Sequence, residues 1–364
     1  MLQTDFTVLT INPGSTSTKL AVYAGDKPIL IRALRHRDEE MLQFKGKPAL
    51  AQLEFRSSAI RRELCDAGIP ISSLHAVVGR GGLLGPVTSG TYRIGAEMLD
   101  ELRTAKRGDH PANLGAILAN SIAEEANIDA FIVDPPTVDE WQDVARLSGS
   151  SLMERACWGH VLNTKAIARR YAAESGKPYA ELRLMIAHLG SGVTVSAHEH
   201  GRMIDSTAVQ EGAFSADRTG ELPVIKLAQL CYSGQYSLQK MERLLFGEGG
   251  LYSYLGTKDL QEVERRIADG DSFAALVYDA MVYQIAKVIG SISTVLHGRV
   301  DAMLITGGMA HSEKLISRLL PSVSWIAPVT IYPGEDELRA MAEGAMRVLR
   351  QEEVAREYRS EEKD

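Results

Sequence analysis

The chain contains few cysteines, the residues that stabilise a fold by forming disulfides or binding metal ions. Only three of its 364 residues are cysteines, Cys65, Cys157 and Cys231. They are far apart and form no Cys-x-x-Cys pair, so the sequence predicts neither a zinc site nor a disulfide framework. Because unpaired cysteines are typical of a reducing compartment, we expect a cytoplasmic protein.

The sequence also lacks an excess of positive charge and an export signal. It has 40 Lys and Arg against 47 Asp and Glu, a net charge of −7. Non-specific nucleic-acid binding needs a basic surface that releases counterions, so this balance argues against such a partner. The N-terminal segment MLQTDFTVL has neither the basic stretch nor the apolar core of a signal peptide.

No uninterrupted apolar stretch is long enough to predict a membrane span. The longest, 273–297, is interrupted by Asp279, Gln284 and Lys287. Its apolar residues follow the spacing of a helix. We therefore expect a long helix that is buried in a core or in a dimer interface, and no membrane partner.

Strand-like and helix-like stretches alternate along the whole chain, an order typical of an α/β fold. Strands are expected at 7–12, 76–79, 130–134, 184–188, 193–198 and 302–306, and helices at 112–127, 160–175, 273–297 and 335–353. At about 150 residues per domain, the length favours two domains. We place them at 1–180 and 181–364, with the last helix packing back on the first domain.

One pattern occurs twice. The segment from Val8 reads VLTINPGSTSTKLAVYAGDKPI, and that from Leu184 reads LMIAHLGSGVTVSAHEHGRMI. Each predicts a strand, a Gly-Ser turn and a second strand, and each half later contains a strand that ends in paired glycines. The pattern predicts two related domains that face each other, and the alternative is a chance likeness between two glycine-containing hairpins.

The turn of the first hairpin has the composition of a phosphate-binding loop. Gly14 lets backbone amides approach an anion, hydroxyl groups add donors, and Lys19 adds positive charge. The spacing fits neither a Walker A loop nor a GxGxxG motif, and the alternative is an ordinary hairpin turn. The candidate phosphate-binding residues are Gly14, Ser15, Ser17 and Lys19, with Gly190, Ser191 and Gly192 in the second copy.

Two such hairpins with a later glycine pair resemble the sugar kinase, actin and Hsp70 ATPase superfamily. Three strings in this order resemble its acetate kinase family: HLGSGVT from His188, DRTGE from Asp217 and ITGG from Ile305. Four more fit the butyrate kinase branch best: GRGGLL from Gly79, HPAN from His110, VDPP from Val133 and HVLNTK from His160. The resemblance implies two duplicated ribonuclease H-like (actin-like) α/β domains. Each has a mixed five-stranded sheet flanked by helices, and the active-site cleft lies between them.

The resemblance also implies an activity. The family transfers the γ-phosphoryl group of ATP to a short carboxylate, giving ADP and an acyl phosphate, with Mg²⁺. We expect butanoate or isobutanoate on the side of the first domain and ATP on the side of the second. The alternatives are an acetate or propionate kinase and, from another class, an ATP-switched binding protein like actin or Hsp70. A homodimer or higher homo-oligomer is implied by the resemblance alone.

Four residues match the catalytic positions of the family. Arg80 and Arg218 match its two arginines, and the guanidinium fork suits both carboxylate and phosphoryl oxygens. Asp134 follows a predicted strand, where α/β sheets place their sites, and the resemblance implies that it helps to hold magnesium, in part through water. His160 opens a helix, and the resemblance implies contact with the transferring phosphoryl group rather than a role as a base.

The resemblance assigns further residues to the nucleotide. Gly307, Gly308 and Met309 are expected under the nucleotide, where glycines allow a close approach of the backbone. Asn12 and His188 are expected near the phosphates or the metal.

Some positions depart from the family pattern. In acetate kinases, a glutamate that helps to place the metal follows the glycine pair, and this chain has no glutamate there. Either Glu335 supplies that carboxylate or the set of metal ligands differs. Glu335 is alternatively part of the first turn of the last helix. His110 lies one position away from the family histidine, and its role stays open.

The residue before His160 bears on substrate size. Acetate kinases typically have an aromatic residue there, and this chain has Gly159, which predicts room for a longer acyl tail. Trp158, Leu83 and Leu84 either line the tail pocket or belong to the core.

Overall fold

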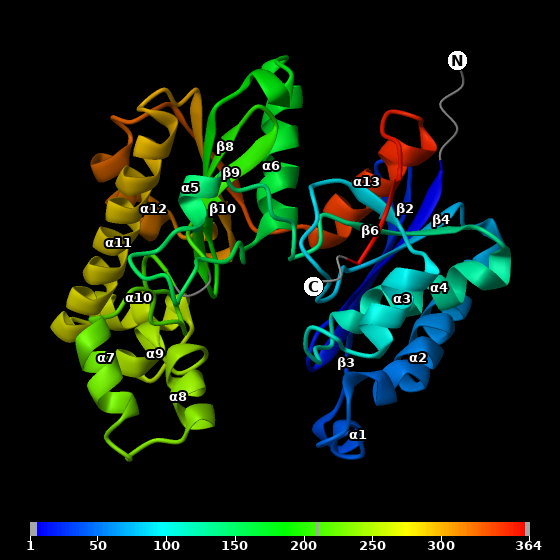
Figure 1. The fold of residues 1–364 in the computed structure, drawn as a ribbon, viewed down its shortest axis with the longest axis horizontal. Coiled ribbons are helices and arrows are strands. Elements are labelled where there is room, and N and C mark those ends of the chain that lie inside the picture. The colour runs from blue at the N-terminus through cyan, green and yellow to red at the C-terminus, as the bar shows by residue number, and fades with distance from the viewer. Residues whose placement is uncertain (1–5, 209–210, 361–364) are drawn as a thin grey trace. The chain divides into compact units, whose positions relative to one another are not determined.

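The computed structural model describes residues 6–208 and 211–360 and divides the chain into two compact units (Figure 1). The first unit consists of 1–139 and 336–364, and the second of 140–335. The division after 139 differs from the expected boundary after 180. The reason is that helix α6 (Val161–Ser175) packs on the sheet of the second unit.

The sheet of the first unit has seven strands within the described residues, in the order β12-β5-β6-β4-β1-β2-β3. Their bounds are β1 (Thr7–Pro13), β2 (Ser17–Ala24), β3 (Lys27–Arg35), β4 (Ala76–Gly79), β5 (Thr91–Arg93), β6 (Asp129–Val133) and β12 (Arg356–Glu357). Strand β1 is antiparallel to β2 and parallel to β4, which is parallel to β6. The expectation of five strands is wrong here, because β5 pairs with the outer edge of β6 and β12 with β5.

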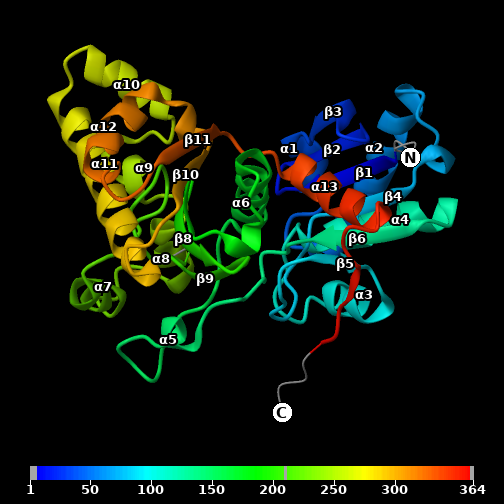
Figure 2. The same ribbon diagram turned by 90° about the horizontal axis from the view of Figure 1, so that it is seen from above.

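Helices cover both faces of this sheet (Figure 2). Their bounds are α1 (Asp38–Leu42), α2 (Leu53–Asp66), α3 (Ala96–Arg103), α4 (Asn113–Ala126) and α13 (Glu337–Leu349), with short 3₁₀ turns at Ala49–Gln52 and Ile71–Ser73. Side chains of a strand alternate between its two faces. Ile132 of β6 belongs to the apolar cluster formed with α4, whereas Val133 lies against Gly344 of α13. Helices α4 and α13 therefore pack on opposite faces.

The sheet of the second unit repeats this plan. Its order is β11-β10-β7-β8-β9, with β7 (Leu184–Leu189), β8 (Val193–Glu199), β9 (Arg202–Ser206), β10 (Ala302–Gly307) and β11 (Val329–Pro333). Strand β7 is antiparallel to β8 and parallel to β10, which is parallel to β11. Five strands of each sheet thus share one topology, which confirms the predicted duplication.

Both faces of the second sheet are also covered by helices. The helices are α5 (Asp143–Arg146), α6, α7 (Val224–Cys231), α8 (Leu238–Leu245), α9 (Gly250–Leu255), α10 (Leu260–Ala268), α11 (Ser272–Ser293) and α12 (Glu313–Val323), with 3₁₀ turns at Tyr179–Glu181, Thr294–Leu296 and Gly308–His311. Ile186 of β7 packs with α6, and the next residue, Ala187, packs with α11 and α12. Strand β10 is buried along its whole length and is mainly apolar, as is typical of strands covered on both faces.

Helix α11 is the long apolar helix expected from the sequence. Within the described residues, Ser272–Leu296 has the length and apolarity of a membrane-crossing helix. One face, however, packs against β7, β8 and α12, and Asp279 pairs with Arg318 at 2.7 Å. The other face exposes Phe273 and Leu276, so α11 is a core helix of the second unit that is buried on one side only.

A buried polar network lies beneath α6. Lys165 pairs with Glu140, and both are buried. The His198 ring lies between the Tyr179 hydroxyl, 2.6 Å from Nδ1, and the Ser196 hydroxyl, 2.8 Å from Nε2. Burial and the positive charge of Lys165 hold the pKa of His198 well below its ordinary value, so the folded protein keeps this ring neutral.

The neutral His198 makes stability fall in acid. Below about pH 6.5 the unfolded chain protonates this histidine and the folded chain does not, so the free energy of unfolding drops by about 1 kcal/mol per pH unit. Urea unfolding at pH 7.5 and 5.5 measures this loss. We expect His198→Gln to lose less stability on acidification than the wild type does, and His200→Gln, at an exposed position, to lose as much. An equal loss in all three proteins would contradict the assignment.

Candidate functional site

The carboxyl ends of three parallel strands bring predicted residues together in the first unit. Asn12 lies near the end of β1, Arg80 follows β4 and Asp134 follows β6. The registers of β1 with β4 and of β4 with β6 place these three positions at one edge of the sheet. This is the edge at which α/β sheets bind ligands.

Glu337, which sequence reasoning did not single out, joins this edge. Asn12 Nδ2 donates to Glu337 Oε2 at 2.7 Å, and Arg80 Nη2 lies 3.4 Å from Glu337 Oε1. The Arg80 side chain is 12% exposed, and its buried Nη1 has no hydrogen-bond partner among the described residues. A buried guanidinium N–H needs an acceptor, so Arg80 is arranged to bind an oxyanion.

Asp134 is held in an unusual conformation. Its φ is +37°, in the left-handed region that few residues other than glycine adopt. Its buried Oδ1 accepts hydrogen bonds from Ser89 Oγ at 2.6 Å and from the Gly90 N–H at 2.8 Å. Strain of about 1–3 kcal/mol is typical of functional sites, where the surrounding structure enforces it. The carboxylate is therefore fixed in orientation at the end of β6.

The turn between β1 and β2 lies next to Asn12. The Gly14 N–H donates to the Ser17 carbonyl at 2.8 Å and closes the turn, and Ser15 is exposed. Lys19 is directly opposite Asn12 in the β1–β2 ladder, so their side chains share one face. The turn thus presents hydroxyl groups and a cation near Asn12.

His110 lies within electrostatic range of Arg80. Its Nδ1 accepts from the Ala112 N–H at 3.1 Å, just before α4. Desolvation lowers the pKa of His110, and the charge of Arg80 lowers it further, against the opposing effect of Asp109. The neutral ring stabilises the loop before α4 through its hydrogen bond with the Ala112 N–H, and we assign no further role to it.

The second unit has the corresponding edge. His188 lies near the end of β7, which leads into the turn 190–192, and Gly307 and Glu335 lie at and beyond the ends of β10 and β11. Because these three strands are parallel neighbours, the positions share one edge of the second sheet.

Two histidines stack at this edge. The rings of His160 and His188 are 3.9 Å apart between centroids and 11° from parallel. Thr194 Oγ1 lies 3.0 Å from His160 Nδ1, and Asn163 Oδ1 lies 2.9 Å from His188 Nδ1. His188 Nε2 is 3.5 Å from Glu335. The protein thus sets the orientation of both rings.

The position of Glu335 corrects one expectation. Helix α13 begins at Glu337, after the N-cap Asp336, so Glu335 is not part of its first turn. Glu335 lies beside His188 in the second unit, and Glu337 is the carboxylate beside Asn12 in the first. The two glutamates are two residues apart, and only the three-dimensional structure assigns them to different edges.

Arg218 borders the turn of the second hairpin. A Cβ placed on Gly192 would lie 2.5 Å from Arg218 Nη1, so the guanidinium lies directly against this glycine. The Ser215 hydroxyl donates to the Ser191 carbonyl and accepts from the Arg218 N–H at 3.3 Å. Burial lowers the pKa of Arg218, although Asp217 acts in the opposite direction. Among the described residues no ion pair engages this guanidinium, which leaves it able to bind an anion.

The glycine pair lies above a cavity of about 460 Å³. Gly308, at the start of the 3₁₀ turn after β10, lines it together with Leu260, Glu264, His311 and Lys314. Met309 is buried in the core with α11 and also lines this cavity.

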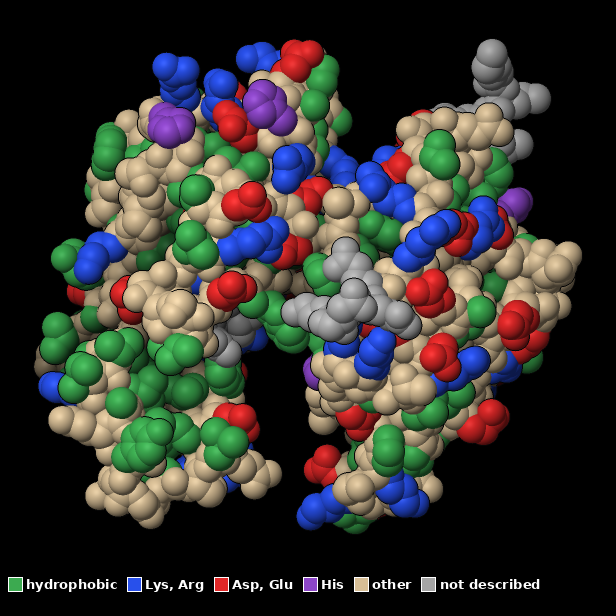
Figure 3. Space-filling model, viewed as in Figure 1, with side chains coloured by type: hydrophobic (Ala, Val, Ile, Leu, Met, Phe, Trp, Pro, Cys, Tyr) green, Lys and Arg blue, Asp and Glu red, His purple; other side chains and the backbone are tan. Residues whose placement is uncertain are grey.

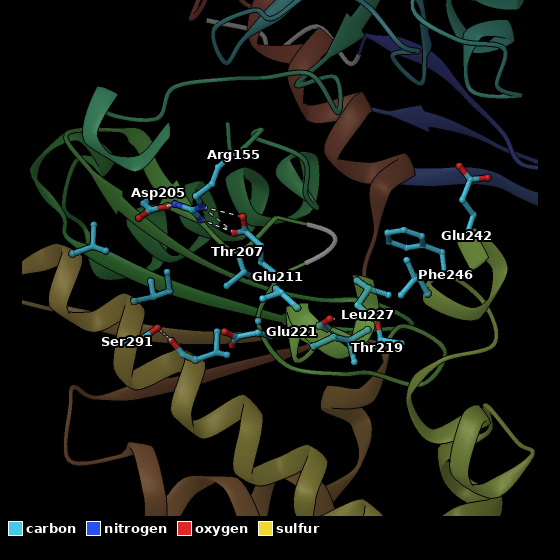
Figure 4. Close-up of a pocket in the computed structure, with 18 residues that line it drawn as sticks. Arg155, Asp205, Thr207, Glu211, Thr219, Glu221, Leu227, Glu242, Phe246 and Ser291 are labelled. Atoms are coloured by element: carbon cyan, nitrogen blue, oxygen red, sulfur yellow. Dashed lines mark hydrogen bonds and ion pairs between the residues drawn. The ribbon is translucent and has the colours of Figure 1, made fainter. Parts of the chain in front are cut away.

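A larger cavity of about 750 Å³ is lined by none of the predicted site residues, although Thr219, which follows Arg218 in the sequence, is part of its lining (Figure 4). Arg155 donates to Glu211 at 2.7 Å and pairs with Asp205 at 3.2 Å on one wall. Leu227 and Phe246 belong to the apolar wall. The predicted chemistry therefore gathers at the two sheet edges, and not in this cavity.

The residues that were expected to set substrate size lie in different units and differ in exposure. Leu84 is 2% exposed and belongs to the core of the first unit, and Trp158 is 47% exposed in the second. A Cβ on Gly159 would lie 3.2 Å from Thr194 Cγ2. A side chain at 159 would therefore crowd the threonine that contacts His160.

The described residues fit a magnesium ion that is shared with a nucleotide. They contain no group of three or more His, Cys, Asp or Glu able to hold a metal by themselves. Asp134 and Glu337 supply carboxylate oxygens at the first edge. Mg²⁺ commonly takes one or two carboxylates and completes its shell with phosphate oxygens and water.

Comparisons with known proteins agree with this architecture. The acetokinase family model matches residues 157–331, a little under half of the chain. The fold is similar to that of Porphyromonas gingivalis acetate kinase, with a TM-score of 0.78 at 18% identity over 94% of this chain and 100% of that one. It is also similar to a Francisella tularensis propionate kinase, with a TM-score of 0.69 at 16% identity over 93% and 98% of the two chains.

Gly307 and Gly308 offer a matched test of the second edge. Gly307 has a φ of +92°, and a Cβ there would lie 2.3 Å from the Leu189 carbonyl oxygen, whereas Gly308 has open space. We expect Gly307→Ala to lower the free energy of unfolding by about 3 kcal/mol or more. Gly308→Ala should change it by less than about 1 kcal/mol. Urea unfolding measures both, and equal effects would show that the close approach is not needed.

Proposed function

We propose that the protein is a carboxylate kinase of the acetate kinase family. It transfers the γ-phosphoryl group of ATP to a short-chain carboxylate, butanoate or isobutanoate, and the reaction is reversible. The observation that carries the proposal is the pair of arginines at the two edges. Arg80 has a buried N–H without an acceptor, and Arg218 has no ion-pair partner among the described residues.

The first edge suits the carboxylate. The substrate carboxylate is already ionised and is itself the nucleophile, so no residue has to remove a proton from it. Its approach to ATP is opposed by charge repulsion, which a cation between the two anions offsets. Arg80, whose only ion pair among the described residues is with Glu337 at 3.4 Å, is placed to donate to the carboxylate.

The second edge suits the nucleotide. Phosphate oxygens are bound by backbone amides of the turn 190–192, and the cavity beside Gly308 receives the nucleoside. In the first unit, the turn 14–17 presents donors that suit the oxygens of a phosphoryl group. Asn12 and Lys19 flank that turn.

Arg218 and His160 bind the phosphoryl group that moves. In a loose transition state negative charge spreads over the equatorial oxygens, and donors aimed at them lower the barrier. The Arg218 fork provides two such donors. The His160 ring is fixed by Thr194 and by stacking on His188, so it is positioned before the substrate arrives.

Asp134 and Glu337 would hold the magnesium ion. In kinases of this chemistry Mg²⁺ neutralises charge on the β- and γ-phosphates. Glu337 takes the place that the sequence analysis gave to Glu335, because Glu337 shares the edge of Asp134. Asn12 positions Glu337 through its hydrogen bond.

The acyl chain length is the finer part of the proposal. Gly159 puts no side chain before His160, and even a Cβ there would lie 3.2 Å from Thr194 Cγ2. Each additional buried methylene adds only about 0.8 kcal/mol, so neighbouring acids should also react. The similarity to acetate and propionate kinases fits a shorter acid equally well.

We also propose that the chain forms a homodimer or higher homo-oligomer through its second unit. Helix α7 is apolar but has no buried residue, and Val224 and Ile225 are exposed, as are Leu238 and Tyr232 nearby. Figure 3 shows hydrophobic side chains gathered over α7 and α8. Sedimentation velocity tests this assembly, and a monomer at micromolar concentration would contradict it.

Acyl phosphate formation tests the activity. We expect hydroxylamine trapping of the product from ATP, Mg²⁺ and acids of two to six carbons to give the highest kcat/KM at four or five carbons. A maximum at two or three carbons would keep the chemistry and change the substrate. Binding of ATP without product from any acid would favour the ATP-switched binding protein.

Substitution of the arginines tests the roles of the two edges. We expect Arg80→Ala to raise KM for the carboxylate and Arg218→Ala to lower kcat, with losses of about 10²–10³ in kcat/KM. Arg265→Ala removes an exposed ion pair with Asp269 and should leave both parameters unchanged. Losses below threefold in both active-site variants would contradict the assignment.

A further inference from the structure

A fully buried arginine of the first unit lies behind the turn between β1 and β2. Arg56, on helix α2, is fully buried. Nothing in the sequence pattern distinguishes it from Arg61 and Arg62 on the same helix. Its position becomes informative only through its contacts.

The guanidinium of Arg56 donates to the backbone of this turn. Nη2 lies 2.8 Å from the Gly14 carbonyl oxygen and 3.5 Å from that of Ser15, and Nη1 lies 2.9 Å from that of Ser17. In a planar trans peptide the carbonyl and the following N–H point in opposite directions. The N–H groups of Ser15 and Thr16 therefore point away from Arg56, on the side where both residues are exposed.

These two N–H groups have no acceptor in the part of the chain that the structure describes. Neither Ser15 nor Thr16 donates a backbone hydrogen bond to any described residue. The Thr16 carbonyl accepts from the His36 N–H at 3.0 Å, so it too is turned inward. Successive backbone N–H groups on one side of a turn form an anion-binding concavity.

The positive charge of Arg56 has no counterion in the described residues. Its other partners are uncharged: Gln52 Oε1 at 2.8 Å, the Thr18 hydroxyl at 2.7 Å and His36 Nε2 at 3.3 Å. Burial and the charge of Arg56 lower the pKa of His36, so that ring is neutral. Burial lowers the pKa of Arg56 to about 10, which leaves it charged at neutral pH. A buried charge without a partner is costly, and an anion bound nearby reduces that cost.

We propose that Arg56 is a positioning residue of the phosphate-binding turn. It holds the carbonyl oxygens of Gly14, Ser15 and Ser17 inward, so that the Ser15 and Thr16 N–H groups face a phosphoryl group, and it places an unneutralised positive charge behind them. The proposal rests on the proposed function, in which this turn binds the terminal phosphates of a nucleotide. The buried Thr18 hydroxyl accepts a hydrogen bond from Arg56 Nη1 at 2.7 Å and so helps to hold the guanidinium in place.

Nucleotides with different numbers of phosphates test this role. Calorimetric titration with AMP, ADP and ATP compares the wild type with Arg56→Gln, Arg56→Lys and the control Arg62→Gln, an exposed residue of the same helix. We expect Arg56→Gln to weaken ATP binding about tenfold and AMP binding less than twofold, because a hydrogen-bonded charge acts mainly on the terminal phosphates. Arg56→Lys keeps the charge without the fork, so its loss should be about threefold for ATP. Arg62→Gln should bind all three as the wild type does.

The outcomes separate the two proposals. An equal loss for AMP and ATP, or no loss for ATP, would overturn the role of Arg56, because a merely structural effect does not depend on the number of phosphates. Far-UV circular dichroism checks folding, and if Arg56→Gln does not fold, the same comparison in Arg56→Lys decides. If the wild type does not bind ATP, the proposed function falls and this inference falls with it.

Discussion

The carboxyl ends of parallel strands are the constraint on which both candidate sites depend. In each unit the first strand of a hairpin has a parallel neighbour, and a third parallel strand follows. Their ladders bring residues from distant parts of the chain to one edge, as with Asn12, Arg80 and Asp134. A register shift of one residue would turn every one of these side chains to the opposite face.

Positive charge at these edges is arranged to receive anions. Among the described residues, Arg80 keeps a buried N–H without an acceptor and Arg56 has no counterion behind the first turn, while Arg218 lies against Gly192. The protein has a net charge of −7, so these three guanidinium groups place positive charge locally in a chain that is acidic overall. The proposed phosphorylation of a carboxylate brings two anions together, and positive charge at both edges fits that requirement.

The residues that sequence reasoning missed are those whose role depends on long-range contacts. Glu337 lies more than 300 positions after Asn12, its hydrogen-bond partner, and Arg56 reaches a turn about 40 positions earlier. Nothing near either residue in the sequence records these contacts. For Glu335 the family resemblance suggested a metal ligand and its place in the sequence suggested the first turn of the last helix, but the contact that the structure shows is with His188.

The α/β class, the duplicated hairpins and several strands and helices could be determined from the sequence, because periodicity and glycine turns are local properties. The strands 76–79, 130–134 and 302–306 are all observed within one residue of their predicted bounds. The unit boundary after 139, the two additional strands of the first sheet and the burial of Met309 came from the tertiary structure. Each of these depends on which surfaces pack together, and packing partners far apart in the chain leave no local pattern in it.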